Sequence, residues 1–159
     1  MSFEHRDQYM QMAIRQAEAA MEQGETPTGC VIVRLTGPGQ PSLSAIIGKA
    51  HNQVETLRDA TAHAEMIAIT QASSAMGDWR LLNTAVYVTK EPCPMCAGAI
   101  IRSRIPYVVY GASDPRGGGV SVFNILQHPS LNHRCKVYPG VMEEQCRELL
   151  QRFFRQRRR

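Results

Sequence analysis

The chain has 159 residues, of which 43% are hydrophobic and 20% charged, with a net charge of +4. These proportions are typical of one globular domain. No apolar run approaches the roughly 20 residues that span a bilayer, and the polar amino terminus lacks the apolar stretch of a signal peptide. Five cysteines, an odd number, argue against a disulfide framework. We therefore expect a single domain over residues 1–159, in the cytoplasm, with no membrane contact.

The hydrophobic pattern alternates between helices and strands. Apolar residues three and four apart indicate helices, and β-branched runs indicate strands. In chain order, the predicted elements are a helix over 5–23, a strand over 30–35, a loop over 36–42, a strand over 43–48, a helix over 63–75, a strand over 85–89, a helix over 94–103, a strand over 107–111, a short helix over 120–126, a strand over 135–138 and a helix over 141–157. This order predicts an α/β fold with three layers, α/β/α, around a mixed sheet.

Two cysteines stand at the start of the helix predicted from residue 94. Cys93 and Cys96 are three residues apart and so share one face of a helix. Pro94 fits the first helical turn, where its missing N–H costs nothing. Cys93 then lies at the helix N-terminus, where free N–H groups and the helix dipole favour a thiolate. Two thiolates on one face suit a zinc ion.

A second helix start supplies the best third ligand. His63 opens the helix predicted over 63–75, so both helix N-termini can point at one metal. A catalytic zinc site takes three protein ligands and leaves one position for water, whose pKa the metal lowers. Glu65, two residues after His63, can reach that water and carry its proton. We therefore predict a catalytic Zn²⁺ site with His63, Cys93 and Cys96 as ligands and Glu65 as the general base.

Each of these residues also has a simpler explanation when taken alone. A C-x-x-C pair is typical of redox pairs and of half of a structural zinc site. For a structural site, the fourth ligand would come from Cys30, His51, His128 or Cys135. A lone histidine often caps a helix, and a glutamate in a first turn interacts favourably with the helix dipole. Together, these explanations must account for four residues in two helix-opening motifs, so the catalytic interpretation is favoured.

The end of the chain is strongly basic. Residues 147–159 carry six arginines and one acid. Arg155, Arg157 and Arg158 could contact RNA phosphates, which would give an affinity that falls with salt. A solvated helix end explains the same run, and from charge alone it is the favoured explanation. Phe153 and Phe154 continue the apolar face of the last helix, so we predict both in the core.

The two metal-site motifs also carry a resemblance. His63-Ala64-Glu65 and the later Pro92-Cys93-x-x-Cys96 resemble the H-x-E and P-C-x-x-C signature of the zinc-dependent nucleobase deaminases. This resemblance implies a cytidine deaminase-like fold with a five-stranded sheet and a hydrolytic deamination. It also implies that Asn52, which precedes the first motif, contacts the substrate.

Within that family, segments along nearly the whole chain are similar to bacterial tRNA adenosine deaminases, which convert the wobble adenosine of the anticodon to inosine. The discriminating segments are 131–134 and 153–158. This similarity implies a tRNA anticodon stem-loop as partner and a homodimer. The substrate-binding residues that we expect from it are Asn52, Thr28, Ala64, Asp114, Asn132, His133, Arg134, Arg155 and Arg157.

One segment departs from the tRNA enzymes. Residues 26–30 read Thr-Pro-Thr-Gly-Cys, whereas those enzymes usually have valines on both sides of the proline and alanine after the glycine. Thr26 and Thr28 would therefore place two hydroxyl groups in the base pocket. A deaminase of a free base or nucleoside, such as guanine or cytosine, is the second hypothesis. A non-catalytic RNA-binding or structural zinc protein is the third.

Overall fold

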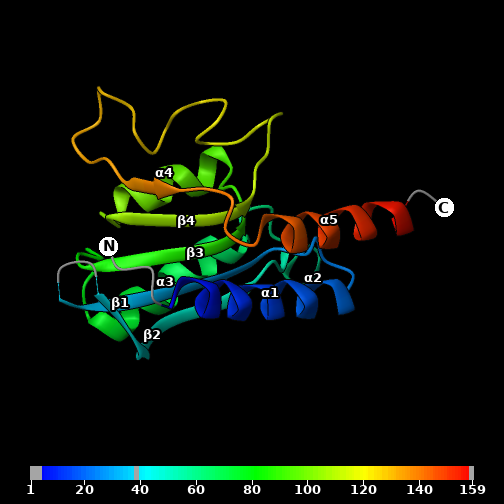
Figure 1. The fold of residues 1–159 in the computed structure, drawn as a ribbon, viewed down its shortest axis with the longest axis horizontal. Coiled ribbons are helices and arrows are strands. Elements are labelled where there is room, and N and C mark those ends of the chain that lie inside the picture. The colour runs from blue at the N-terminus through cyan, green and yellow to red at the C-terminus, as the bar shows by residue number, and fades with distance from the viewer. Residues whose placement is uncertain (1–4, 38–39, 158–159) are drawn as a thin grey trace.

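The structure is a computed structural model and describes residues 5–37 and 40–157. Its centre is a five-stranded sheet with the strand order β2-β1-β3-β4-β5 (Figure 1). The strands are β1 (Gly29–Gly37), β2 (Gln40–His51), β3 (Thr84–Lys90), β4 (Tyr107–Ala112) and β5 (Lys136–Tyr138). β1 pairs antiparallel with β2 and β3, whereas β3, β4 and β5 run parallel. The predicted mixed sheet of five strands is confirmed.

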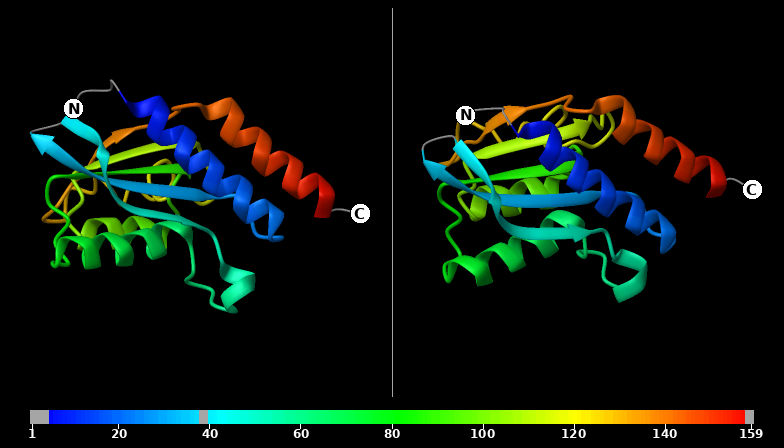
Figure 2. Two further views of the ribbon diagram at one scale, coloured as in Figure 1. Left: turned by 90° about the horizontal axis from the view of Figure 1, so that it is seen from below. Right: turned by 60° about the horizontal axis from the view of Figure 1, so that its bottom comes forward.

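Helices cover both faces of this sheet (Figure 2). α1 (Arg6–Glu22) and α5 (Glu143–Arg157) lie on one face, and α3 (Ala64–Met76) and α4 (Pro94–Arg102) lie on the other. β1 shows why both faces are covered, since Val31 and Val33 pack in the cluster with α1 while Ile32 packs in the cluster with α3 and α4. The three-layer α/β/α arrangement is therefore confirmed. No helix among the described residues has the length and apolar character to cross a membrane.

Two glycines let the helices approach the sheet closely. A Cβ at Gly29 would lie 1.9 Å from the carbonyl oxygen of Ala13 in α1. One at Gly48 would lie 2.6 Å from the carbonyl oxygen of Ala68 in α3. Any side chain at either position would push backbone away in a tightly packed interior.

The loop predicted over 36–42 is wrong, because most of it is strand. β1 continues to Gly37 and β2 begins at Gln40, with Leu35 opposite Pro41 and Gly37 opposite Gln40. β2 is an edge strand, and an edge strand tolerates a proline because one row of its backbone groups needs no partner strand. Antiparallel pairing therefore outweighs the glycine and proline content. Residues 38 and 39 lie outside the described part of the chain.

Two further differences concern helices. Residues 120–126 form successive turns instead of the predicted short helix. The backbone N–H groups of Val120 and Ser121 donate to the carboxylate of Glu91. The backbone of this segment is therefore held by a residue distant in sequence. The short helix α2 (Val54–Leu57) between β2 and α3 was not predicted. α2 and the start of the segment 120–126 lie at the end of the sheet where the site is predicted.

That end is where several segments meet. β3 and β4 finish there, and β1 begins there, with the Gly29 N–H donating to the Thr89 hydroxyl at 3.1 Å. α4 starts just after the end of β3, and α3 follows β2 after the short helix α2. The fold thus brings together residues that are far apart along the chain.

Candidate active site

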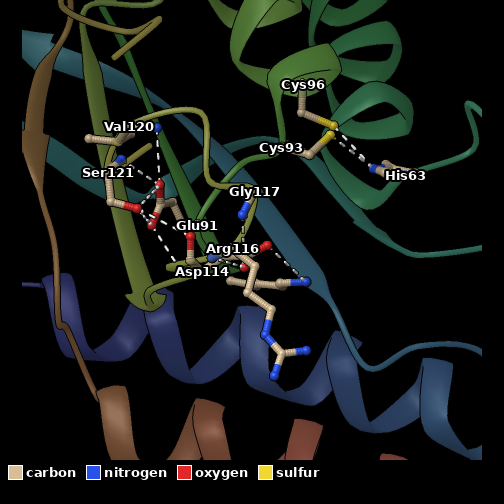
Figure 3. Close-up of polar contacts among 10 residues, drawn as sticks. His63, Glu91, Cys93, Cys96, Asp114, Arg116, Gly117, Val120 and Ser121 are labelled. Carbon is tan, nitrogen blue, oxygen red and sulfur yellow. Dashed lines mark hydrogen bonds and ion pairs between the residues drawn. The ribbon is translucent and has the colours of Figure 1, made fainter. Parts of the chain in front are cut away.

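Three potential metal ligands converge where α3 and α4 begin. His63 directly precedes α3 and Cys93 directly precedes α4, both with extended backbone, and Cys96 lies in the first turn of α4. The Nδ1 atom of His63 lies 3.4 Å from the Sγ atom of Cys96 and 3.6 Å from that of Cys93 (Figure 3). All three ligand atoms lie within 4.8 Å of one another.

These separations fit a tetrahedral zinc ion. Typical Zn–S and Zn–N bonds of about 2.3 and 2.0–2.1 Å place nitrogen and sulfur about 3.6 Å apart at a tetrahedral angle. The donor set of two sulfurs and one imidazole nitrogen is also one that zinc prefers. Hydrogen bonding with Cys96, and further with His63, lowers the pKa of Cys93 to about 4. Cys93 is therefore a thiolate near neutral pH, as a metal ligand must be.

The carboxyl group of Glu65 is buried beside these ligands. Glu65 is 3% exposed, and its Oε1 atom has no hydrogen-bond partner among the described residues. Burial raises the pKa of Glu65. A buried carboxyl oxygen without a partner is costly in a folded protein and is typical of functional sites. Its place beside the three ligands suits a group that moves protons.

A cavity of about 280 Å³ opens beside the ligands. It is lined by His63, Glu65 and Cys93 and by five of the residues expected to bind substrate. These five are Thr28, Asn52, Ala64, Asp114 and Arg157. Residues from six separate stretches of sequence therefore share one cavity, although no local sequence pattern links the stretches.

Asn52 presents a free acceptor to this cavity wall. Its Nδ2 atom donates to the carbonyl oxygen of Thr26 at 3.4 Å, and its backbone N–H donates to that of Thr28 at 3.1 Å. Its buried Oδ1 atom has no partner among the described residues. The two bonds tie the end of β2 to the segment before β1, and they leave Oδ1 available to a donor on a ligand.

Sequence reasoning missed Glu25, which is fully buried and lines the cavity. Its carboxylate accepts hydrogen bonds from the backbone N–H groups of Glu55 and Thr56, at 3.0 and 2.7 Å, and from the Thr56 hydroxyl at 2.6 Å. These bonds fix α2 against the segment before β1. No local signal identifies Glu25, because its partners lie about 30 positions later in the chain.

Glu91 fixes the opposite wall of the cavity by hydrogen bonds, as Glu25 fixes α2 (Figure 3). This buried carboxylate accepts from the backbone N–H groups of Asp114, Val120 and Ser121 and from the Ser121 hydroxyl. It therefore holds the glycine-rich loop 114–121 in place. Its position directly before the P-C-x-x-C motif was the only sequence signal for it.

The end of α5 closes one side of the cavity. Arg157 donates to the carbonyl oxygen of Gly24, and its guanidinium lies 4.6 Å from the centre of the Phe153 ring. Phe153 is buried as predicted, but Phe154 is 46% exposed and lines the cavity, so its predicted place in the core is wrong. Successive residues of a helix point in different directions, which separates the two rings. Arg155 is exposed and does not line the cavity.

The structure does not bring Asn132, His133 and Arg134 to this cavity. They precede β5, whose pairing with β4 places them at the other end of that strand (Figure 1). His133 Nε2 lies 2.8 Å from the carbonyl oxygen of Ile105, and Arg134 donates to carbonyl oxygens of its own loop. Any substrate contact through these residues would lie outside the cavity, and it stays a prediction.

With this geometry established, comparison with known sequences identifies relatives. A family model described as MafB19-like deaminase matches residues 4–158. The tRNA-specific adenosine deaminase of Bacillus subtilis (strain 168) is 47% identical over 152 residues, which are 95% of this chain and 89% of that protein. The tRNA-specific adenosine deaminase of Aquifex aeolicus (strain VF5) is 46% identical over 154 residues, which are 96% of each chain.

Solved structures agree with these relatives. One comes from a study of A-to-I editing by tRNA:A34 deaminases at the wobble position, and it matches with a TM-score of 0.81 and 40% identity over 90% of this chain and 99% of that chain. A guanine deaminase from Nitrosomonas europaea matches with a TM-score of 0.77 over 92% and 83% of the two chains, but at 19% identity it shares only the fold. This chain therefore belongs to the MafB19-like deaminase family and, among its relatives, to the tRNA-specific adenosine deaminases.

Proposed function

We propose that this chain hydrolyses the wobble adenosine of a tRNA anticodon to inosine, with one Zn²⁺ held by His63, Cys93 and Cys96. The observation that carries the proposal is the placing of these three ligands beside the buried carboxyl group of Glu65, with His63, Cys93 and Glu65 lining one cavity. The 47% identity to a tRNA-specific adenosine deaminase, along nearly the whole chain, supports adenosine in tRNA as the substrate.

The reaction consumes one water and releases one ammonia, because the oxygen of water replaces the amino group at C6 of the purine. When bound, zinc supplies a water that is acidic enough to attack near neutral pH. Glu65 takes a proton from that water and passes it to N1 of the base, and then a second proton to the departing amino group. A raised pKa suits this double transfer, because the carboxyl group must both accept and release protons.

The cavity walls would orient the base. The free Oδ1 atom of Asn52 accepts a hydrogen bond from the flipped nucleoside, while Thr28 and Ala64 form the wall beside it. The target base must leave the anticodon stack to reach this position. Phe154, half-exposed at the cavity, offers an aromatic surface where the unstacked strand enters.

The test is an assay of a stem-loop that carries adenosine at the wobble position. Inosine is measured by nuclease digestion and chromatography, and zinc is measured on the same preparation. A stem-loop with guanosine at the wobble position, and adenosines elsewhere, is the matched control. Inosine formed only from the first substrate supports the proposal. A zinc-loaded preparation that forms none contradicts it.

A free-base deaminase is the second candidate. Thr26 and Thr28 line the cavity and add hydroxyl groups to it, which favours a different pattern of hydrogen bonds. Ammonia release from guanine, cytosine and adenosine tests this candidate directly. Ammonia from a free base, without inosine in the stem-loop, would replace the first proposal with the second.

A homodimer and a cytoplasmic location belong to the same proposal. A tRNA partner requires the enzyme to work where tRNA is found, and Arg152 and Arg155 lie exposed along α5, where they can approach a polyanion. Sedimentation of the protein, alone and with the stem-loop, gives the number of subunits in the protein and the number of stem-loops that it binds. A monomer that binds one stem-loop with full activity would contradict the dimer.

A further inference from the structure

The cavity is lined by more carboxylates than cations, which is unfavourable for a substrate that carries phosphates. Five carboxylates line it. Glu25 and Glu91 are buried and accept hydrogen bonds from backbone N–H groups, and Glu65 is buried beside the metal ligands. Glu55 and Asp114 remain as the two carboxylates in contact with solvent. A phosphate that approaches this cavity therefore needs a cation close to one of them.

Two cations line the cavity within the described part of the chain, apart from the histidine: Lys90 and Arg157. Arg157 is already engaged, because it donates to the carbonyl oxygen of Gly24 and lies over the Phe153 ring. These contacts hold the end of α5 in place. Lys90 is therefore the better candidate for a charge that meets the substrate.

Lys90 is the last residue of β3, three positions before Cys93. Its Nζ atom lies 3.6 Å from Oδ2 of Asp114, and its side chain is 33% exposed. This distance is an ion pair but is long for a hydrogen bond. The ammonium group thus keeps its N–H donors for another acceptor. Oδ1 of Asp114 meanwhile accepts from the N–H groups of Arg116 and Gly117, which fixes the carboxylate in its own loop (Figure 3).

We propose that Lys90 binds a phosphate of the substrate strand next to the target nucleotide, while it neutralises Asp114 on its other side. The inference rests on the proposed function and deepens it, because such a contact favours a nucleotide within a strand over a free base. A lysine suits this role, since its ammonium is a compact point charge that can contact two anions at once. Without it, the carboxylate of Asp114 would repel the same phosphate.

The first test measures how the deamination of the stem-loop depends on salt. We expect Lys90→Gln to raise KM several-fold with little change in kcat, because the proposed contact is to a phosphate and not to the base that reacts. We also expect the slope of log(kcat/KM) against log[salt] to fall in magnitude by about 0.7, the effect of one phosphate on a single strand. Lys90→Arg should keep the slope. Lys49→Gln, at an exposed position of β2 outside the cavity, is the matched control.

The second test separates a direct contact from mere neutralisation of Asp114. If Lys90 contacts phosphate, Lys90→Gln should change the slope as much in an Asp114→Asn background as in the wild type. A stem-loop with a neutral methylphosphonate on either side of the target adenosine should erase the difference between wild type and Lys90→Gln at one of the two linkages. Equal losses at every linkage, or no effect of Lys90→Gln once Asp114 is neutral, would overturn the proposal.

The phosphate could also belong to a free nucleotide, so adenosine 5′-monophosphate is assayed beside the stem-loop. Turnover of this nucleotide that matches the stem-loop and depends on Lys90 would assign the site to free nucleotides instead. The failures are distinguishable. A wild type that forms no inosine in the stem-loop defeats the proposed function, whereas an active wild type with an unchanged salt slope in Lys90→Gln defeats only this inference.

Discussion

The two ends of β4 carry the same kinds of side chain, but among the described residues only one end brings potential metal ligands together. Near its carboxyl end, His63 meets Cys93 and Cys96, with nitrogen–sulfur distances of 3.6 and 3.4 Å. Near its amino end, His133 and Cys135 lie close together in sequence, but both contact the carbonyl oxygen of Ile105, at 2.8 and 3.2 Å. One histidine faces other ligands, whereas the second faces backbone.

Cys93 and Cys135, one thiol from each end, also differ in pKa. Burial raises the pKa of Cys135 to about 12, whereas hydrogen bonding with Cys96 lowers that of Cys93 to about 4. Cys93 directly precedes a helix, where free N–H groups favour a thiolate, and Cys135 precedes the short strand β5. Residue type alone therefore does not bring potential metal ligands together; here the convergence of two helix N-termini does.

The largest effect should come from breaking this difference at the thiols. Cys96→Ser should lower zinc affinity by more than about 100-fold. Loss of a ligand should weaken binding more than loss of a residue that only hydrogen-bonds to a ligand, which costs about 10- to 100-fold. Inosine formation should fall to background. Cys135→Ser should keep both, since a serine hydroxyl can still donate to Ile105. The measurements are the zinc content and the inosine yield of the two variants. Equal loss of zinc in both would contradict the difference between Cys96 and Cys135.

The next largest effect should come from Glu65, which we expect to be needed for catalysis but not for zinc binding. Glu65→Gln should keep zinc but lose about 10²- to 10⁴-fold in kcat, because an amide cannot accept and return the proton. Glu144→Gln, at an exposed position on α5, is the control. Turnover close to wild type in Glu65→Gln would remove the general base from the mechanism. A preparation of wild type with zinc and no turnover would instead favour the non-catalytic hypothesis.

These two variants test the part of the site that local sequence patterns predict. Cys93 and Cys96 are three positions apart, and His63 opens the preceding of the two helices, so their choice as candidate ligands follows from patterns that are local in the chain. Each helix start can be identified from a proline or from apolar spacing. The resemblance then joined the two motifs, and the fold confirmed that they meet.

Sequence reasoning failed where the partners are distant. The contacts of Glu25 with Thr56 and of Glu91 with Ser121 span about 30 positions each, so no window of sequence contains both members. The same carboxylate of Glu91 explains why residues 120–126 form turns. Asn132, His133 and Arg134 show that a segment can match a family closely without lying in the cavity, and their contact with substrate stays a prediction.

A moderate effect should follow from disturbing the wall that Glu91 holds. A Cβ at Gly118 would lie 1.9 Å from Oε2 of Glu91, whereas one at Gly117 would meet nothing closer than 3.9 Å. Gly118→Ala should therefore destabilise the fold by about 1–3 kcal/mol and raise KM, because the loop that carries Asp114 must move. Gly117→Ala is the matched control in the same loop. Urea unfolding and steady-state kinetics measure both, and equal effects of the two variants would contradict the close contact.

The smallest effect should be a pH-dependent one at Glu25. The three buried carboxylates among the described residues, Glu25, Glu65 and Glu91, all line the cavity. Burial by itself raises the pKa of Glu25, but the hydrogen bonds from Thr56 and from the N–H of Glu55 outweigh it and lower the pKa. A carboxyl group whose pKa is lower in the folded state stabilises the fold above its unfolded pKa, and this contribution is lost as pH falls through the folded value.

Glu25→Gln should therefore unfold at lower urea concentration near neutral pH, because its amide nitrogen cannot accept the bond that one carboxylate oxygen made. The difference from wild type should shrink below about pH 4, where the unfolded carboxyl group is protonated and the folded one begins to follow. Glu22→Gln, at an exposed position on α1, should show no such trend. An equal loss of stability near neutral pH and below pH 4 would contradict this prediction. It would mean that the packing of the Glu25 side chain, and not its charge, holds α2 against the cavity.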